Sequence, residues 1–306
     1  MTRVVNQLYG TVRMIFGEIN NFFTIVERAS AGWKKWKTKK IGSVPKRFIE
    51  LFESHGVHRN QIPRFFNHNI ELNDLVDDAS LLKKLTEPVL DAVCSLFGVR
   101  REWLDGACDE PYARHEFYKY PENFDQFIDK LKHANPDVEI NGYLIVPEDA
   151  TRTDESALIL EESVGTIGDT IIYRYHLCDD WFFSYWKSRA YLAACVAIAW
   201  KKGVFVKGWY AKKQEIFALS GKRNLLGPVI NRLVPCGRRW YAEDLALLPE
   251  RYLEEIDPEE NMFGVISALS LWLKLDEEGW MDTGLRNLVR QTFEVELAKY
   301  DASQCI

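Results

Sequence analysis

The hydrophobic pattern of the chain changes near residue 137, and this change most constrains its fold. Before that point, apolar residues recur at the three- and four-residue steps of amphipathic helices. After it, short runs rich in β-branched and aromatic residues occur at 140–146, 157–161 and 170–177, bounded by glycines. Because helical segments return near the C-terminus, the sequence predicts a mixed fold. An all-α N-terminal part, made of a long helix and a helical module, is followed by an α+β C-terminal domain.

The same pattern predicts the segment boundaries. We expect an amphipathic helix with a basic segment at 1–43, a helical module at 44–110, a linker with one helix at 111–136, and an α+β sensor or interaction domain at 137–306. A length of 306 residues agrees with about two domains. A hydrophobic fraction of 47% and a charged fraction of 27% are those of an ordinary globular chain, which excludes disorder over most of it.

The last segment combines strands and helices. The elements expected after its third strand are a helix at 179–202, hairpin strands at 204–210 and 215–219, and helices at 257–275 and 282–300. Aromatic residues are dense from residue 181 to residue 217, where they either fill the core or line a ligand pocket. In the second interpretation, the pocket residues are Trp181, Tyr185, Trp186 and Trp209.

The first 36 residues carry an uninterrupted three-four repeat of apolar residues. One seam of the repeat is β-branched, as parallel two-stranded coiled coils favour. Aromatic residues widen the stripe, which is typical of a helix packed on its own protein. Both interpretations stay open. In the first, the chain is a homodimer whose contact residues are Val5, Leu8, Val12, Ile15, Ile19, Phe22 and Val26.

A basic segment follows this helix. Between Trp33 and Arg47 there are seven basic residues and no acidic one, in a chain whose net charge is −6. Clustered lysines bind nucleic-acid phosphates by releasing condensed counterions. They are equally the cations that the macrodipole favours at the C-terminal end of a helix. In the first interpretation, the phosphate contacts are Lys34, Lys35, Lys37, Lys39 and Lys40.

Residues 44–106 divide into several short helical stretches separated by turns. Phe48–Gly56 and Val57–Phe66 form the opening stretches, and the clearest one is Pro88–Val99, followed by Trp103 and Leu104. This last stretch has a first-turn proline and a helix-ending glycine. On these residues, the module resembles the helix-turn-helix domain of the Cro and phage-repressor class.

The resemblance implies a compact helical fold that binds double-stranded DNA. In that class the second helix braces the DNA backbone and the third enters the major groove. By position, these helices start near Arg59 and near Glu71. Arginine, glutamine and asparagine make the pairings that discriminate base edges. The implied DNA contacts on the module are Arg59, Gln61, Arg64 and Asn73.

The charge of the module argues against DNA reading by this third helix. Residues 71–110 contain ten acidic and four basic residues, so they repel phosphates. Pro63 also stands where such a second helix usually carries a small residue. A helix-turn-helix fold used for protein contacts is therefore the alternative interpretation.

The sequence offers no catalytic signature. It carries no Walker loop, no G-x-G-x-x-G, no H-E-x-x-H and no G-x-S-x-G. His176 and Cys178 supply two ligands where zinc needs four, so we expect no metal, no cofactor and no catalytic residue. Six cysteines without C-x-x-C indicate reduced thiols. Without a membrane-length apolar run or a secretory signal, we expect a cytoplasmic protein that does not contact membranes.

These patterns support two hypotheses of function. The first is a homodimeric DNA-binding transcriptional regulator whose C-terminal domain senses a small molecule or a protein partner. The second is an adaptor that binds no DNA and uses the helical module and the C-terminal domain for protein contacts.

Overall fold

The computed structural model of the protein describes residues 44–220, 224–284 and 286–301. The predicted helix at 1–43 lies outside these residues. Two sets of predicted contacts therefore also lie outside the described residues: the dimer contacts from Val5 to Val26 and the phosphate contacts from Lys34 to Lys40.

The described residues fold around one mixed sheet with the strand order β1-β4-β3-β2-β5-β6. The pairs β1–β4 and β2–β5 are parallel, and the other three are antiparallel. The strands are β1 (Arg114–Glu116), β2 (Ile140–Pro147), β3 (Glu155–Ile167), β4 (Thr170–Phe182), β5 (Phe205–Ala211) and β6 (Arg239–Tyr241).

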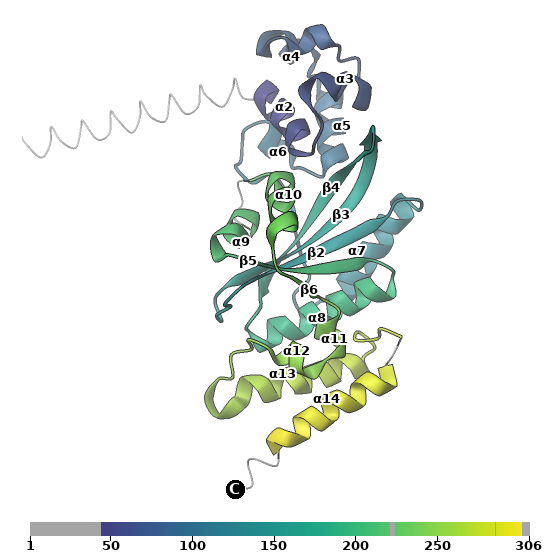
Figure 1. The fold of residues 1–306 in the computed structure, drawn as a ribbon. Helices are drawn as coiled ribbons and strands as arrows, with labels where there is room; N and C mark the ends of the chain where they lie inside the picture. Colours follow the sequence, from purple (N-terminus) through teal and green to yellow (C-terminus); the bar gives the residue numbers. More distant parts are fainter. Residues whose placement is uncertain (1–43, 221–223, 285, 302–306) are drawn as a thin grey trace, which may run out of the picture.

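The helical module covers one face of the sheet, together with two helices from the C-terminal part of the chain (Figure 1). The module consists of α2 (Val44–Ser54), η1 (Arg59–Gln61), α3 (Ile62–Phe65), η2 (Leu72–Leu75), α4 (Asp78–Lys84), α5 (Glu87–Phe97) and α6 (Arg101–Leu104). The two additional helices are α9 (Lys213–Ser220) and α10 (Leu226–Cys236). The module is therefore packed on the sheet through a shared hydrophobic core.

Helices α7 (Pro121–Ala134) and α8 (Trp186–Lys201) cover the other face. Beyond them lie α13 (Phe263–Glu277) and α14 (Arg286–Asp301), as Figure 1 shows. The short helices α11 (Asp244–Leu247), α12 (Pro249–Leu253) and η3 (Glu260–Met262) connect β6 to α13. Among the described residues, no helix combines the length and apolar character of a membrane span.

The two cores follow from the two-residue period of the strands. On β3, Ile159 faces the module whereas Leu158 and Leu160 face α7 and α8. On β2, Tyr143 likewise faces the module and Leu144 faces α7 and α8. Because both faces are covered, central strands appear in the sequence as continuous apolar runs.

The predicted fold class is confirmed: a helical N-terminal part precedes an α+β part. Two element predictions are wrong. The helix expected from Asp179 starts only at Trp186, because β4 continues through Phe182 in register with β3. Residues 215–219 belong to helix α9 rather than to a hairpin strand, and β5 pairs with β2 and β6 instead.

Candidate interaction surfaces

The segment predicted as the third helix of the module is shorter than expected. Its regular part is η2, a 3-10 helix of four residues. The backbone N–H of Glu71 donates to Asp74 Oδ2 (2.8 Å), and the N–H groups of Ala79 and Ser80 donate to Asp77 Oδ1 (2.9 and 2.8 Å). Aspartate side chains that bond the local backbone favour turns and helix starts over helix interiors. Two such aspartates three residues apart therefore divide the segment.

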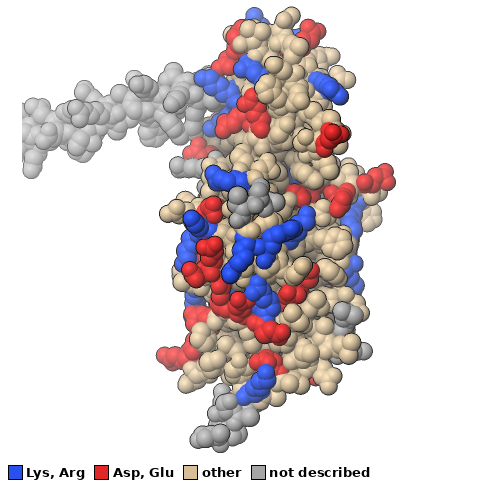
Figure 2. Space-filling view, in the orientation of Figure 1, with Lys and Arg blue, Asp and Glu red and all other residues tan. Residues whose placement is uncertain are grey.

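An apolar surface lies where a DNA-reading helix would be expected. Leu72 on η2 is 58% exposed, Val76 directly after η2 is 75% exposed and Leu82 on α4 is 52% exposed, and η2 and α4 are in contact. We call these three residues the tip patch. Carboxylates surround the patch in the sequence: Glu71, Asp74, Asp77 and Asp78. Figure 2 shows this upper end of the molecule as apolar or uncharged surface with charged residues at its margin.

Two of these carboxylates are neutralised by nearby lysines. Lys84 Nζ lies 3.5 Å from Asp74, and Lys46 Nζ lies 4.0 Å from Asp78. Asp77 is exposed, and hydrogen bonds from Ser80 and Ala79 hold its pKa below the ordinary value. Asp77 thus stays ionised beside the tip patch.

The four residues predicted to contact DNA bases lie on or beside contacting elements, η1, α3 and η2, but differ in exposure. Arg64 and Asn73 are exposed, on α3 and η2. Gln61 uses its Oε1 atom to accept from the backbone N–H of His58 (2.9 Å), which completes a capping box at η1. Arg59 is half-buried, and its Nε has no hydrogen-bond partner.

Arg59 lines a groove between the module and α10. The groove has a volume of about 750 Å³ and mixes three basic with three acidic side chains. The charged residues that line it are Lys46, Glu50, Glu53, Arg59, Asp78 and Arg232. Its mixed charge gives no preference for a cationic or an anionic ligand.

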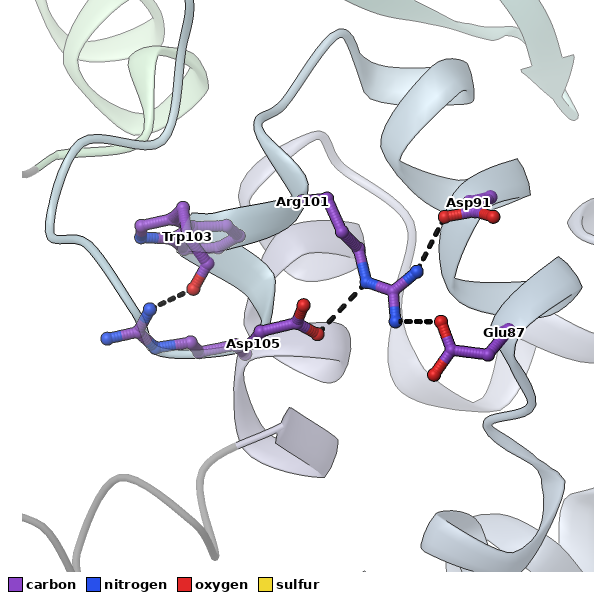
Figure 3. Close-up of polar contacts among 6 residues, drawn as sticks. Glu87, Asp91, Arg101, Trp103 and Asp105 are labelled. Carbon is purple, nitrogen blue, oxygen red and sulfur yellow. Dashed lines mark hydrogen bonds and ion pairs between the residues drawn. The ribbon is translucent and has the colours of Figure 1, made fainter.

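Much of the module's remaining acidity is used internally. Figure 3 shows Arg101 donating to three carboxylates: Asp105 (2.9 Å), Asp91 (2.5 Å) and Glu87 (2.7 Å). The contacts with Asp91 and Glu87 join α6 to α5 across the turn that follows Gly98, which adopts a left-handed conformation (φ 68°). Arg47 of α2 donates to the carbonyl oxygen of Trp103 and lies over its ring. The Trp103-Leu104 end of the module is thereby fixed to α2.

The predicted ligand pocket is wrong as a single site. Trp181 and Trp209 are both buried, but they belong to the cores on opposite faces of the sheet. The Trp181 ring N–H donates to the carbonyl oxygen of Cys178 (3.1 Å). Tyr185 and Trp186 are half-buried at the start of α8, and the Trp186 ring contacts Phe263. The density of aromatic residues in this segment reflects two separate cores.

A buried histidine connects the module to the sheet and to α10. The His55 ring lies between Phe97 (4.3 Å between ring centroids) and Tyr175 (5.6 Å), and its Nδ1 is 2.7 Å from the carbonyl oxygen of Leu51. The Tyr112 hydroxyl, 3.5 Å from His55 Nε2, accepts from the N–H of Leu226 (3.3 Å). Burial lowers the pKa of His55 to about 4, so the ring is neutral at pH 7.

A buried carboxylate, Glu162, makes a second connection. Arg174 donates to it through Nε (3.0 Å) and Nη2 (2.7 Å), and also donates to the carbonyl oxygen of Ser95 on α5. His176 Nε2 lies 3.0 Å from Glu162, and Asn135 also donates to it. Burial acts to raise the pKa of Glu162, but the bonds from His176 and Arg174 lower it to about 2.

His176 therefore has a structural partner. The other member of the pair considered for a metal, Cys178, is fully buried in the core formed with α7 and α8. In the part of the chain that the structure describes, no group of three or more histidine, cysteine or acidic side chains is placed to hold a metal ion.

Sequence reasoning missed the tip patch. The sequence nevertheless indicates it, because Leu72, Val76 and Leu82 lie near carboxylates in a short segment that cannot bury all three aliphatic side chains. Comparison of the chain with protein-family models, curated proteins and solved structures found no match.

Proposed function

We propose that this protein is an adaptor that binds a basic, amphipathic segment of a partner protein at the tip patch. The observation that carries the proposal is the exposure of Leu72, Val76 and Leu82 beside carboxylates. Contiguous exposed apolar residues with a polar rim are typical of protein interaction sites. Of the rim carboxylates, Glu71 and Asp77 form no ion pair with a lysine among the described residues, and these two favour a basic partner over phosphates.

The packing of the module supports the same function. The inward faces of α2 and α5 are buried against the sheet, which leaves the η2–α4 end exposed. A surface presented by elements that share a core with the rest of the chain is preorganised, so binding costs little ordering entropy.

The test uses fluorescence anisotropy of the full chain with two labelled peptides of equal length. One is an amphipathic helix of leucine and lysine, and the other carries glutamate in place of lysine. We expect the basic peptide to bind and the acidic one not to bind. Val76→Asp should weaken binding about tenfold or more, because it places a charge in the centre of an apolar contact.

Leu288→Asp is the matched control for this experiment. Leu288 is 73% exposed and lies on α14, at the opposite end of the molecule. Equal affinity of the basic peptide for the Val76 and Leu288 variants would contradict the proposal, as would equal binding of both peptides.

DNA-binding regulation is a second candidate, favoured by Arg59 and Arg64. Neither arginine forms an ion pair within the described ranges, and both are on the η1–α3 segment that would brace a DNA backbone. In this candidate, a labelled duplex added to the same assay binds with a steep salt dependence. In that case, Arg64→Ala lowers the affinity of the protein for the duplex. Val76→Asp lowers this affinity only because the variant adds a negative charge.

A further inference from the structure

The β5–β6 end of the sheet presents aromatic and basic side chains on one face. Tyr241 lies opposite Lys207, and Arg239 lies opposite Trp209. Because strand residues alternate between faces, Phe205 shares the face of Lys207 and Trp209. Phe205 is 51% exposed and Tyr241 is 72% exposed. We call Phe205, Lys207, Arg239 and Tyr241 the sheet-edge platform.

A groove of about 390 Å³ runs beside the platform. The ring of Trp200, at the end of α8, meets Phe205 edge-on with 5.6 Å between centroids. Trp240 forms part of the lining and lies against Gly208, where an added Cβ would be 2.5 Å from its ring. Close packing against Gly208 thus holds Trp240 on the face of the sheet opposite Lys207 and Tyr241.

The two cations of the platform lie over aromatic rings, and the charge of Lys207 also acts to lower the pKa of the nearby Glu161 carboxyl. Lys207 Nζ lies 5.7 Å from the ring centroid of Tyr143, and the Arg239 guanidinium lies 4.9 Å from that of Trp209. Within the described ranges neither side chain forms an ion pair. The acidic residue of the groove is Glu243, and burial raises its pKa. Figure 2 shows Lys and Arg gathered over this part of the sheet.

From these observations, we propose that the sheet-edge platform binds single-stranded nucleic acid. Two exposed rings on adjacent strands offer stacking surfaces for bases, and the two cations are placed beside them to contact phosphates. Bases in a duplex are already stacked on one another, so the platform favours single strands. An acidic peptide would satisfy the cations but would leave both rings without a stacking partner.

The test is anisotropy of the full chain with labelled oligothymidine and oligouridine of twelve nucleotides and with a duplex of the same length, at several salt concentrations. We expect single strands to bind more tightly than the duplex. Phe205→Ala and Tyr241→Ala should each weaken binding between about 5-fold and about 150-fold, as loss of one stacked base does. Lys207→Ala or Arg239→Ala should reduce the salt slope by about 0.7.

The controls are Phe217→Ala and Tyr120→Ala. Phe217 is 74% exposed on α9, and Tyr120 is exposed before α7, both outside the groove. The proposal would be overturned if single strands did not bind near 50 mM salt, where electrostatic contacts are strong. Equal losses in the platform and control variants would overturn it, as would equal displacement by polyglutamate and by unlabelled oligothymidine. Binding abolished by neutralising Lys34 to Lys40 but unchanged by Phe205→Ala and Tyr241→Ala would also overturn it, by assigning the contact to the basic segment.

Discussion

Between pH 7 and pH 4, we expect the buried His55 to lower the free energy of unfolding by about 3 kcal/mol. Burial holds the pKa of His55 at about 4 in the folded protein, against 6.5 as the ordinary value. Between these values, the unfolded chain binds the extra proton and the folded protein does not. The contribution of His55 is therefore fully present above about pH 6.5, and it is lost as the pH falls toward 4.

Urea unfolding of the full chain at a series of pH values measures this effect. His55→Gln should make the free energy of unfolding fall less steeply between pH 7 and pH 4 than in the wild-type protein, because glutamine does not titrate. His133→Gln is the matched control, since His133 is exposed on α7. An unchanged slope in the His55 variant would show that other groups cause the acid sensitivity.

Glu162→Gln should destabilise the protein by about 3 kcal/mol at neutral pH, because it leaves Arg174 without its ionic partner beside a buried site. In the folded protein, the pKa of Glu162 is lowered from 4.5 to about 2. The contribution of ionised Glu162 to the free energy of unfolding is therefore fully present above about pH 4.5, and it is lost as the pH falls through 2. The variant and the wild-type protein should therefore become equally stable near pH 2.

Glu155→Gln provides the comparison for this prediction. Glu155 is on the same strand as Glu162 and is exposed, so its removal should change the free energy of unfolding by less than about 0.5 kcal/mol. Equal effects of the two substitutions would contradict a buried ionic connection between β3, β4 and α5.

The elements with a strong local signal were predicted well. The runs rich in β-branched and aromatic residues on β2 and β3 and the proline and glycine that bound α5 depend on neighbouring residues alone. The structure has β2 and α5 close to the expected positions, whereas β3 extends beyond its expected run at both ends. The position of α9 was missed because Glu215 accepts from the N–H of Lys212 and starts a helix within a segment of apolar and aromatic residues.

The interaction surfaces were less predictable than the fold. The sequence indicated aromatic enrichment near Trp181 and Trp209, but only strand register shows that these two rings are on opposite faces. For the same reason, the sheet-edge platform depends on pairing between residues 207–209 and 239–241, which are at least 30 positions apart. Local periodicity carries no information about such pairings.

The most direct test of the account is amide hydrogen exchange of the full chain with and without the basic amphipathic peptide, read by peptide mass spectrometry. If the tip patch is the binding surface, protection should increase at residues 72–84 and stay unchanged at residues 58–66 and 203–210. Protection confined to 58–66 or 203–210, or no change anywhere, would contradict the proposed adaptor function.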